Sequence, residues 1–253
     1  SYAKVEGEVL SKVVTLPMFA QFLRHSKQFW GSHALDGAKL AAFRQRCDRF
    51  YREKTLERIS LFYKTFERSD GCESINGVVM PTLSHMLNAL DWTWLSHGLP
   101  GRFHGDFHFE NILWQPSRQK FVFLDWRQDF GGDLETGDIY YDLAKLLHGL
   151  IISHELIAKH HFSVNWGPDN ISYDFHRKQM LVECEKQFDT WLALEGYDRK
   201  KVGVLTALIF LNIAALHHHP YSLLLYTLGK SMLHQFSVPT PSHEDARHSL
   251  STP

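Results

Sequence analysis

The sequence has little cysteine and almost no net charge. Its 253 residues contain three cysteines, and 27 basic against 28 acidic side chains give a formal net charge of -1. Three widely spaced cysteines, with no CxxC pair and no zinc-type spacing, exclude a disulfide framework and indicate reduced thiols, as in a cytoplasmic protein. A chain so close to neutral has no overall attraction to nucleic acid or to an anionic membrane, so neither is expected as a partner.

Long apolar runs are also missing. The most apolar stretch, residues 204–216, is shorter than the roughly 20 residues that span a bilayer and predicts a core helix instead. What the sequence does contain is 44% hydrophobic and 13% aromatic residues. That composition is typical of a folded globular protein with a substantial core.

Apolar residues recur at helical spacing over most of the chain. Helices are predicted at 15–30, 36–66 (with one break), 82–99, from Asp138 onward, and at 173–195, 199–216 and 221–235. Asp138 stands at the N-cap of its helix, and Asp142 is expected to bond nearby backbone. Residues 69–78 (SDGCESINGV) are expected to form a loop. The β-type runs ILW and FVFLDW, joined by QPSRQK, predict one hairpin. The expected fold class is therefore α+β, predominantly helical, with a small central β-hairpin.

One short segment, residues 102–114 (RFHGDFHFENILW), concentrates polar side chains between aromatic ones. It is compatible with metal ligands on a strand, with a phosphoryl-transfer site or with a solvated loop. On a strand, His104, Asp106 and His108 would share one face and could bind zinc or a dimetal centre, as in a metal-dependent hydrolase. No second set of His and Asp residues with matching spacing follows downstream, which weighs against that hypothesis.

The spacing of three residues favours phosphoryl transfer. That chemistry needs a carboxylate to orient the attacking hydroxyl, and oxygen ligands for Mg²⁺ on the nucleotide phosphates. Asn111 follows Asp106 by five residues, and Asp125 ends the second strand of the predicted hairpin. A hairpin brings Asn111 and Asp125 to the same end, so both can reach one metal ion.

The segment HGDFHFENIL followed by FLDW resembles the aminoglycoside phosphotransferase and choline kinase-like superfamily, and GDIYYDLAKLL (137–147) is similar to a further segment of that family. The resemblance is sharp over residues 100–150 and extends elsewhere only to the helical layout. It implies the C-terminal lobe of a protein-kinase-like fold. It also implies Mg²⁺, ATP or another nucleoside triphosphate, and a small-molecule acceptor hydroxyl on a sugar, an aminoglycoside or a choline-like compound.

The resemblance also implies roles for individual residues. Asp106 matches the catalytic base of the family, and Asn111 and Asp125 match its Mg²⁺ ligands. His104 and His108 are expected to support the loop. Where many relatives have an acidic residue two places after the metal-binding Asp, this chain has Arg127. Arg127 and Asp129 are therefore candidates for substrate or phosphate contacts.

The expected domain organisation follows from the same resemblance. No Gly-rich loop precedes the first helix, and residues 1–13 resemble the segment that joins the two lobes of the family. Residues 14–236 are then the C-terminal lobe, with the catalytic loop and metal hairpin at 102–126, and 237–253 are a flexible tail. A separate N-terminal nucleotide-binding lobe is the expected partner, and this chain alone is expected to be inactive. A catalytically silent kinase-like binding module is the remaining alternative.

Overall fold

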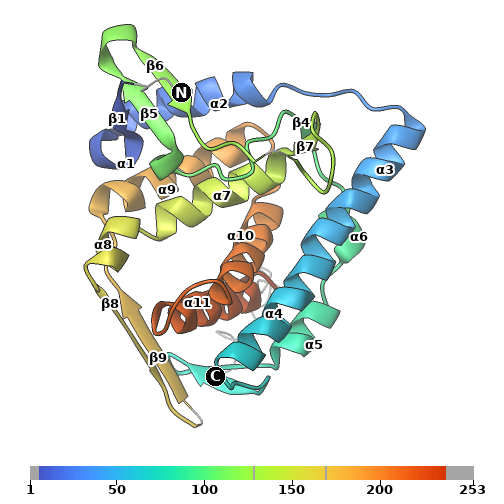
Figure 1. Ribbon diagram of the computed structural model, residues 1–253, viewed down its shortest axis with the longest axis vertical. Helices are drawn as coiled ribbons and strands as arrows, with labels where there is room; N and C mark the ends of the chain where they lie inside the picture. Colours follow the sequence, from blue (N-terminus) through green and yellow to red (C-terminus); the bar gives the residue numbers. More distant parts are fainter. Residues whose placement is uncertain (1–5, 128, 169, 238–253) are drawn as a thin grey trace, which may run out of the picture.

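The computed structural model describes residues 6–127, 129–168 and 170–237. It is predominantly helical with small sheets, which agrees with the predicted α+β class (Figure 1). The helices are α1 (Leu10–Val13), α2 (Leu16–Trp30), α3 (Gly37–Asp48), α4 (Lys54–Thr65), α5 (Leu83–Asn88), α6 (Trp92–Ser96), α7 (Ile139–Ile151), α8 (His154–Ala158), α9 (Gln179–Leu194), α10 (Arg199–Ala214) and α11 (Tyr221–Ser237). None of these described helices combines the length and the apolar character needed to cross a lipid bilayer.

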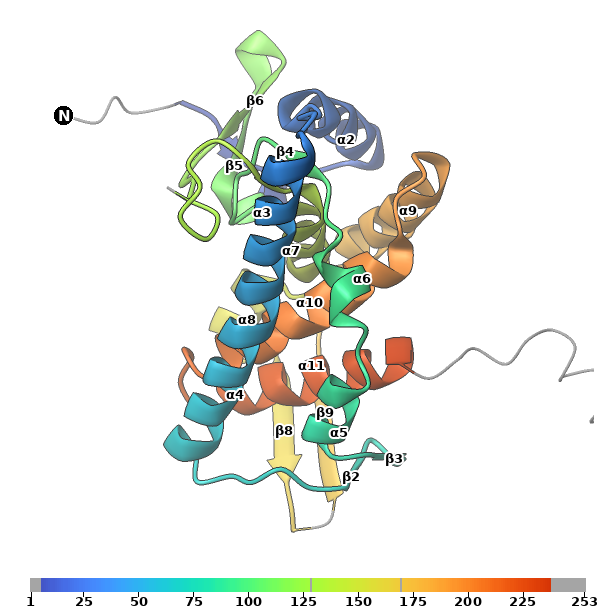
Figure 2. The ribbon, with the colours of Figure 1, turned by 90° about the vertical axis from the view of Figure 1, so that its right-hand side faces the viewer.

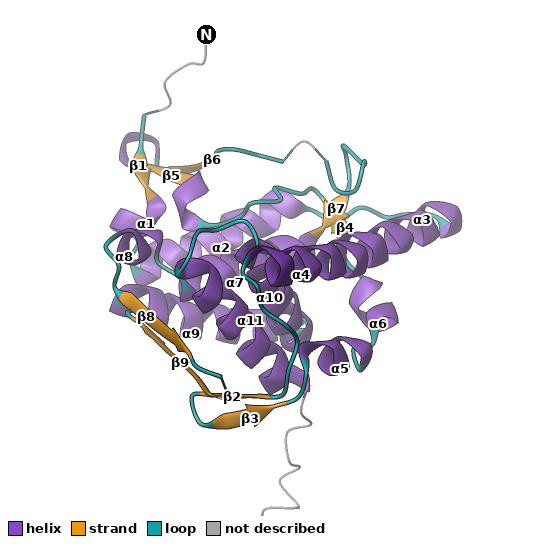
Figure 3. Cartoon of the chain, turned by 60° about the horizontal axis from the view of Figure 1, so that its bottom comes forward, coloured by secondary structure: helices purple, strands orange, loops and turns teal. Residues whose placement is uncertain are grey.

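The strands form three small sheets. The first has the order β1-β5-β6, from β1 (Glu8–Val9), β5 (Ile112–Gln115) and β6 (Lys120–Phe123). The second has the order β3-β2-β9-β8, from β2 (Glu73–Ile75), β3 (Val78–Met80), β8 (Phe162–Trp166) and β9 (Asn170–Phe175). The third pairs β4 (Pro100–Gly101) with β7 (Gly137–Asp138). Among the strands that the structure describes, only the β2–β9 pair is parallel. Figure 3 shows the first two sheets lying apart, so the predicted hairpin β5–β6 belongs to its own small sheet.

Two buried helices, α7 and α10, form the centre of the core. Residues 202–211 of α10 are buried on every side, as an apolar helix without a polar face should be. Helix α10 packs against α7, α4 and α11. The predicted core helix at 204–216 is therefore confirmed, although it ends at Ala214. Because α7 is packed within this core, its side chains have fixed positions. They can therefore hold the loop that follows β4 in place.

The region predicted as one helix with a break, 36–66, is a single continuous helical run (Figure 2). Helices α3 and α4 are joined by a π-helical turn, Arg49–Glu53, which adds one residue without ending the helix. The π turn directs Phe50 and Tyr51 toward the core, where Phe50 packs against Phe130 and Tyr141 at ring distances of 4.6 and 5.0 Å. This contact holds the start of α4 beside α7.

Three local predictions are wrong. The expected loop at 69–78 contains the hairpin β2–β3, whose turn residues Asn76 and Gly77 have φ of 48° and 80°. Asn and Gly readily adopt the left-handed backbone conformation at both turn positions. A two-residue turn of this kind matches the twist of the two strands that it joins. The helix predicted at 173–195 begins only at Gln179, because the residues before it form β9. The helix predicted at 82–99 is split into α5 and α6, where the Asp91 side chain caps a new helix by accepting the Trp94 backbone N–H at 2.8 Å.

The segment expected to link two lobes, residues 1–13, is integrated into this domain from residue 8 onward. Strand β1 pairs with β5, and Leu10 at the start of α1 is fully buried. The remainder of the predicted tail after Ser237, and residues 1–5, lie outside the described residues.

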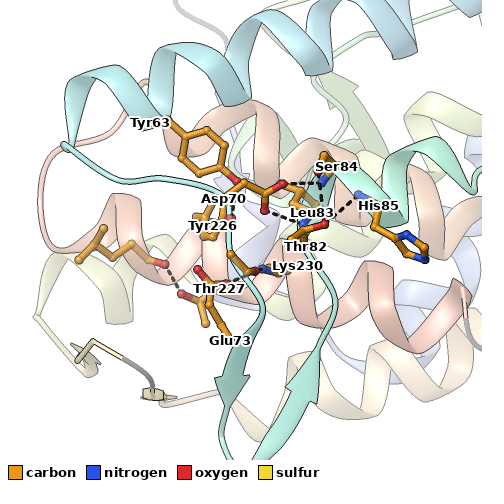
Figure 4. Close-up of polar contacts among 12 residues, drawn as sticks. Tyr63, Asp70, Glu73, Thr82, Leu83, Ser84, His85, Tyr226, Thr227 and Lys230 are labelled. Carbon is orange, nitrogen blue, oxygen red and sulfur yellow. Dashed lines mark hydrogen bonds and ion pairs between the residues drawn. The ribbon is translucent and has the colours of Figure 1, made fainter.

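A buried polar cluster joins the β2–β3 hairpin to two helices (Figure 4). Lys230 on α11 is fully buried, donates to the Gly71 carbonyl at 2.8 Å and forms an ion pair with Glu73 at the start of β2. The Asp70 carboxylate accepts the backbone N–H groups of Leu83 and Ser84 at 2.7 and 2.8 Å. Side chains from the segment between α4 and β2 therefore satisfy both a buried cation and the start of α5.

Candidate active site

The loop of residues 102–111 connects β4 to β5 and ends in a 3-10 turn, Phe109–Asn111. Its start is fixed by the β4–β7 pair, in which Gly101 lies opposite Gly137. Strand β7 runs directly into α7, and the Asp138 carboxylate caps that helix by accepting the Tyr140 N–H at 3.0 Å, as predicted. The loop therefore leaves the core beside the N-terminus of α7.

Asp142 in the first turn of α7 fixes the backbone of the loop. Its carboxylate accepts the N–H groups of His104 and Gly105, both at 2.8 Å, and the Trp30 indole N–H at 3.0 Å. Burial raises the pKa of Asp142 to about 7, against the effect of these three donors. The prediction that Asp142 bonds nearby backbone is confirmed, and the backbone it bonds is the pair of residues immediately before Asp106.

His104 supports the loop from inside. Its ring is fully buried, and Nδ1 accepts the Asp106 backbone N–H at 3.3 Å. Burial lowers the pKa of His104 to about 4, so the ring is neutral at pH 7. The ring packs among the aromatic side chains of Phe107, Phe123 and Trp126.

The Asp106 carboxylate is the focus of the polar contacts. It lies 2.7 Å from Lys145 Nζ and 3.3 Å from His108 Nε2, and it accepts the Asn111 side-chain N–H at 3.0 Å. Burial opposes ionisation, but the hydrogen bond with His108 and the Lys145 ammonium lower the pKa of Asp106 well below its usual range. The side chain remains 28% exposed. An ionised carboxylate with fixed orientation can therefore accept a hydrogen bond from a hydroxyl that approaches from solvent.

Asn111 and Asp125 come from the two sides of the β5–β6 hairpin mouth. Asn111 Nδ2 donates to the Asp106 carbonyl and carboxylate, while Asn111 Oδ1 has no hydrogen-bond partner among residues 6–127, 129–168 and 170–237. The Leu124 N–H donates to the Asn111 carbonyl at 2.8 Å, which brings the next residue, Asp125, to the same end of the hairpin. Asp125 is exposed and has φ of 53°. An amide oxygen and a carboxylate are hard ligands that suit Mg²⁺.

The three-ligand site of a metal-dependent hydrolase is not formed. Within the described part of the chain, no group of three His, Cys, Asp or Glu side chains is arranged to hold a metal ion. The reason lies in the loop: it is not a strand, the His104 Nδ1 is engaged by backbone, and the His104 ring faces aromatic side chains instead of sharing a face with Asp106 and His108.

Arg127 and Asp129 are both exposed and lie beside this loop. The Arg127 N–H donates to the His104 carbonyl at 2.9 Å, and its side chain covers Gly105, where a Cβ would come within 2.7 Å of it. Gly105 also has φ of 83°, so both space and backbone conformation require glycine there. Asp129 accepts the Gly132 N–H in a turn. Both residues line a cavity of about 430 Å³ next to the loop.

Sequence reasoning missed Lys145, which makes the shortest contact to Asp106. Lys145 is 5% exposed and lies on α7, three residues after Asp142 and three before His148. Residues at this spacing share one face of a helix. The signal that was available is a polar stripe of Asp, Lys and His on an otherwise apolar helix, which indicates that the stripe faces a polar site within the fold.

His148 completes this stripe without a hydrogen bond. It is 3% exposed, and neither ring nitrogen has a partner among the described residues. The ring packs against Phe210 at 4.8 Å. Burial lowers the pKa of His148 well below its ordinary value, and the nearby Lys145 ammonium lowers it further, so the ring is neutral in the folded protein.

Replacing His148 by Leu is expected to raise the free energy of unfolding more at pH 5 than at pH 7.5. The folded-state pKa is depressed, so below about pH 6.5 the unfolded chain binds a proton that the folded chain does not, which favours unfolding. Removing the imidazole removes this penalty, worth about 2 kcal/mol at pH 5. Urea unfolding of both proteins at both pH values measures the difference. An equal change at pH 5 and pH 7.5 would contradict the expected neutral state of His148.

The sequence pattern of this chain matches that of a known protein family. The sequence model of the phosphotransferase enzyme family matches residues 20–162, more than half of the chain, including the loop, the β5–β6 hairpin and α7. No curated protein matches the chain. The resemblance found in the residues around Asp106 is thereby confirmed at the level of the family. The chain belongs to the phosphotransferase enzyme family.

Proposed function

We propose that this protein transfers the γ-phosphoryl group of ATP, or of another nucleoside triphosphate, to a hydroxyl group of a small molecule in a Mg²⁺-dependent reaction. The observation that carries the proposal is the Asp106 carboxylate, which is ionised, partly exposed and held by Lys145 and Asn111 beside the hairpin mouth. A separate nucleotide-binding lobe that acts together with this chain is part of the proposal.

Asp106 would act mainly by orienting the acceptor. Its lowered pKa makes it a weak base, so it accepts a hydrogen bond from the hydroxyl and takes the proton only as the new P–O bond forms. Lys145 and His108 hold the carboxylate in place during this step. Phosphoryl transfer depends largely on such positioning and on charge stabilisation.

Asn111 and Asp125 would hold Mg²⁺. The amide oxygen of Asn111 is directed away from its own hydrogen bonds to Asp106, because those use Nδ2, and Asp125 contributes an exposed carboxylate at the same hairpin mouth. When bound, Mg²⁺ offsets part of the charge of the nucleotide phosphates. The Asn111–Asp106 hydrogen bonds couple the position of this ligand to the position of the carboxylate that receives the hydroxyl.

Replacing Asp125 by Asn is expected to raise the Mg²⁺ concentration needed for half-maximal transfer by at least about tenfold, since the site loses its charged ligand. Transfer of labelled γ-phosphate by the full-length protein, with its nucleotide-binding lobe, to a panel of small alcohols, measured over a Mg²⁺ titration, tests this. Asp174→Asn serves as the control, because Asp174 is an exposed carboxylate on β9. An unchanged Mg²⁺ requirement would remove Asp125 from the metal site. Absence of transfer to every alcohol would contradict the proposed function and favour a silent binding module.

A further inference from the structure

Helix α4 carries cations near the face of α7 that holds Lys145. Lys54 Nζ lies 4.3 Å from the centre of the Phe50 ring, and Phe50 packs edge-to-face against Tyr141 on α7. Tyr141 lies four residues before Lys145, on the same face of α7, and Lys145 contacts Asp106. Lys54 therefore lies near the face of α7 that carries Lys145, the residue that contacts the proposed catalytic carboxylate.

Two further cations extend this group. Arg58 follows Lys54 by four residues and shares its face of α4. Arg127 reaches the other side of the loop, where its side chain covers Gly105 next to Asp106. We call Lys54, Arg58 and Arg127 the cationic surface.

The cationic surface carries charge that the protein itself does not balance. Within the described residues, none of its three members forms a salt bridge, whereas Lys145 is matched by Asp106 and Arg46 by Asp133. Lys54 and Arg58 form a like-charge pair at i,i+4, which costs helix stability. Burial and, to a smaller extent, the charges of Arg127, Arg58 and Lys145 together lower the pKa of Lys54 to about 8. Lys54 is thus close enough to Arg58, Arg127 and Lys145 for their charges to act on it, and Lys145 contacts Asp106.

We propose that the acceptor is an alcohol that also carries an anionic group, a carboxylate or a phosphate, and that the cationic surface binds this group while Asp106 receives the hydroxyl. This inference rests on the proposed function. A cationic acceptor would meet repulsion from Lys54, Arg58 and Arg127, and a neutral acceptor would leave their charges uncompensated. Charge-assisted hydrogen bonds to an anion are among the stronger polar contacts, so they add both affinity and orientation.

The first experiment compares matched acceptors with the full-length protein, ATP and Mg²⁺. Glycerol, glycerate and glycerol 3-phosphate differ in charge on one skeleton, as do glucose, glucosamine, gluconate and glucose 6-phosphate. We expect kcat/KM to be at least about tenfold higher for an anionic member than for its neutral or cationic counterpart. Comparison of the carboxylate acceptors with the phosphate acceptors shows which of the two anionic groups is preferred. A preference for the neutral or cationic members would overturn the inference and leave the phosphotransferase function in place.

The second experiment removes one cation at a time. Lys54→Gln and Arg58→Gln should each raise KM for the preferred anionic acceptor by about tenfold, with KM for ATP unchanged. Lys64→Gln is the matched control, since Lys64 is exposed at the far end of the same helix and forms no salt bridge within the described residues. A rise in the KM for ATP instead would assign the surface to the nucleotide, and unchanged KM for both would show that it binds neither.

A binding measurement without nucleotide separates the inference from the proposed function. Glycerol 3-phosphate and glycerol are titrated into the protein and into Lys54→Gln, with inorganic phosphate as a second probe. Binding that requires the anion and weakens in Lys54→Gln supports the acceptor class even when no transfer is detected. Transfer to alcohols with no anion-dependent binding would uphold the phosphotransferase and reject the anionic acceptor.

Discussion

Replacing Asp106 by Asn is expected to lower turnover by about 10²- to 10⁴-fold while the KM for ATP changes little. The carboxylamide keeps the shape of the side chain but cannot accept a proton, and its NH₂ group opposes the Lys145 ammonium that the carboxylate now binds at 2.7 Å. The nucleotide is expected to be held mainly by other groups, so its affinity is not the affected quantity. Steady-state kinetics with both substrates varied would measure kcat and each KM separately.

This variant needs a check on folding, because Lys145 is buried and loses its counter-charge. Unfolding in urea shows whether the variant is folded under the assay conditions, and Asp174→Asn provides the baseline for a carboxylate-to-amide change at an exposed site. Turnover close to that of the original protein would remove Asp106 from its proposed role. A large rise in the KM for ATP at normal kcat would instead place Asp106 in nucleotide binding.

Replacing Asp142 by Asn is expected to lower both the free energy of unfolding, by about 3 kcal/mol, and the turnover of the protein that remains folded. The three groups around Asp142 are all N–H donors. An amide can present only one oxygen, so its NH₂ group faces at least one donor and leaves it unsatisfied in a buried position, at about 1–3 kcal/mol for each such group. The backbone immediately before Asp106 is then held less firmly, so the Asp106 carboxylate is less well positioned and turnover falls.

The matched control for this change is Asp36→Asn. Among the described residues, Asp36 accepts a hydrogen bond only from the Lys39 backbone N–H, as the N-cap of α3, and Asn caps helices about as well as Asp. Urea unfolding should therefore show a change of less than about 0.5 kcal/mol for the control. An Asp142→Asn protein as stable as Asp36→Asn would show that the three hydrogen bonds do not anchor the loop.

Much of the fold near the loop follows from local sequence. The N-cap at Asp138, the helix at 15–30 and the β5–β6 hairpin all depend on residues within a few positions of each other, and the structure has all three. The Asn76-Gly77 turn was also readable as a hairpin signal, but the strands beside it are only three residues long. Strand β2 also pairs with β9, in which each partner lies 96 residues later in the chain, and no local pattern predicts that pairing.

In the candidate site, too, the contacts between residues close in sequence are predictable and the contacts between distant residues are not. The spacing of Asp106, Asn111 and Asp125 is local and predicts that they gather at one hairpin. Lys145 lies 39 residues after Asp106 in the sequence, and its contact with that carboxylate exists only because α7 is packed under the loop. The cationic surface is harder to predict, since the position of Lys54 beside α7 depends on a π-helical turn and on the packing of Phe50 on Tyr141. Periodicity alone assigns such residues to a solvated helix face.

The buried pair of Lys230 and Glu73 restricts which substitutions this sequence can accumulate during evolution. Loss of either side chain leaves the other as an uncompensated buried charge, which typically costs about 3–5 kcal/mol, whereas replacing both with apolar residues of similar volume can be neutral. A path from the ionic to the apolar version therefore passes through a poorly folded intermediate. Positions 73 and 230 should accordingly tolerate change only as a pair, so a viable homologue with an apolar residue at one of them is expected to be apolar at the other.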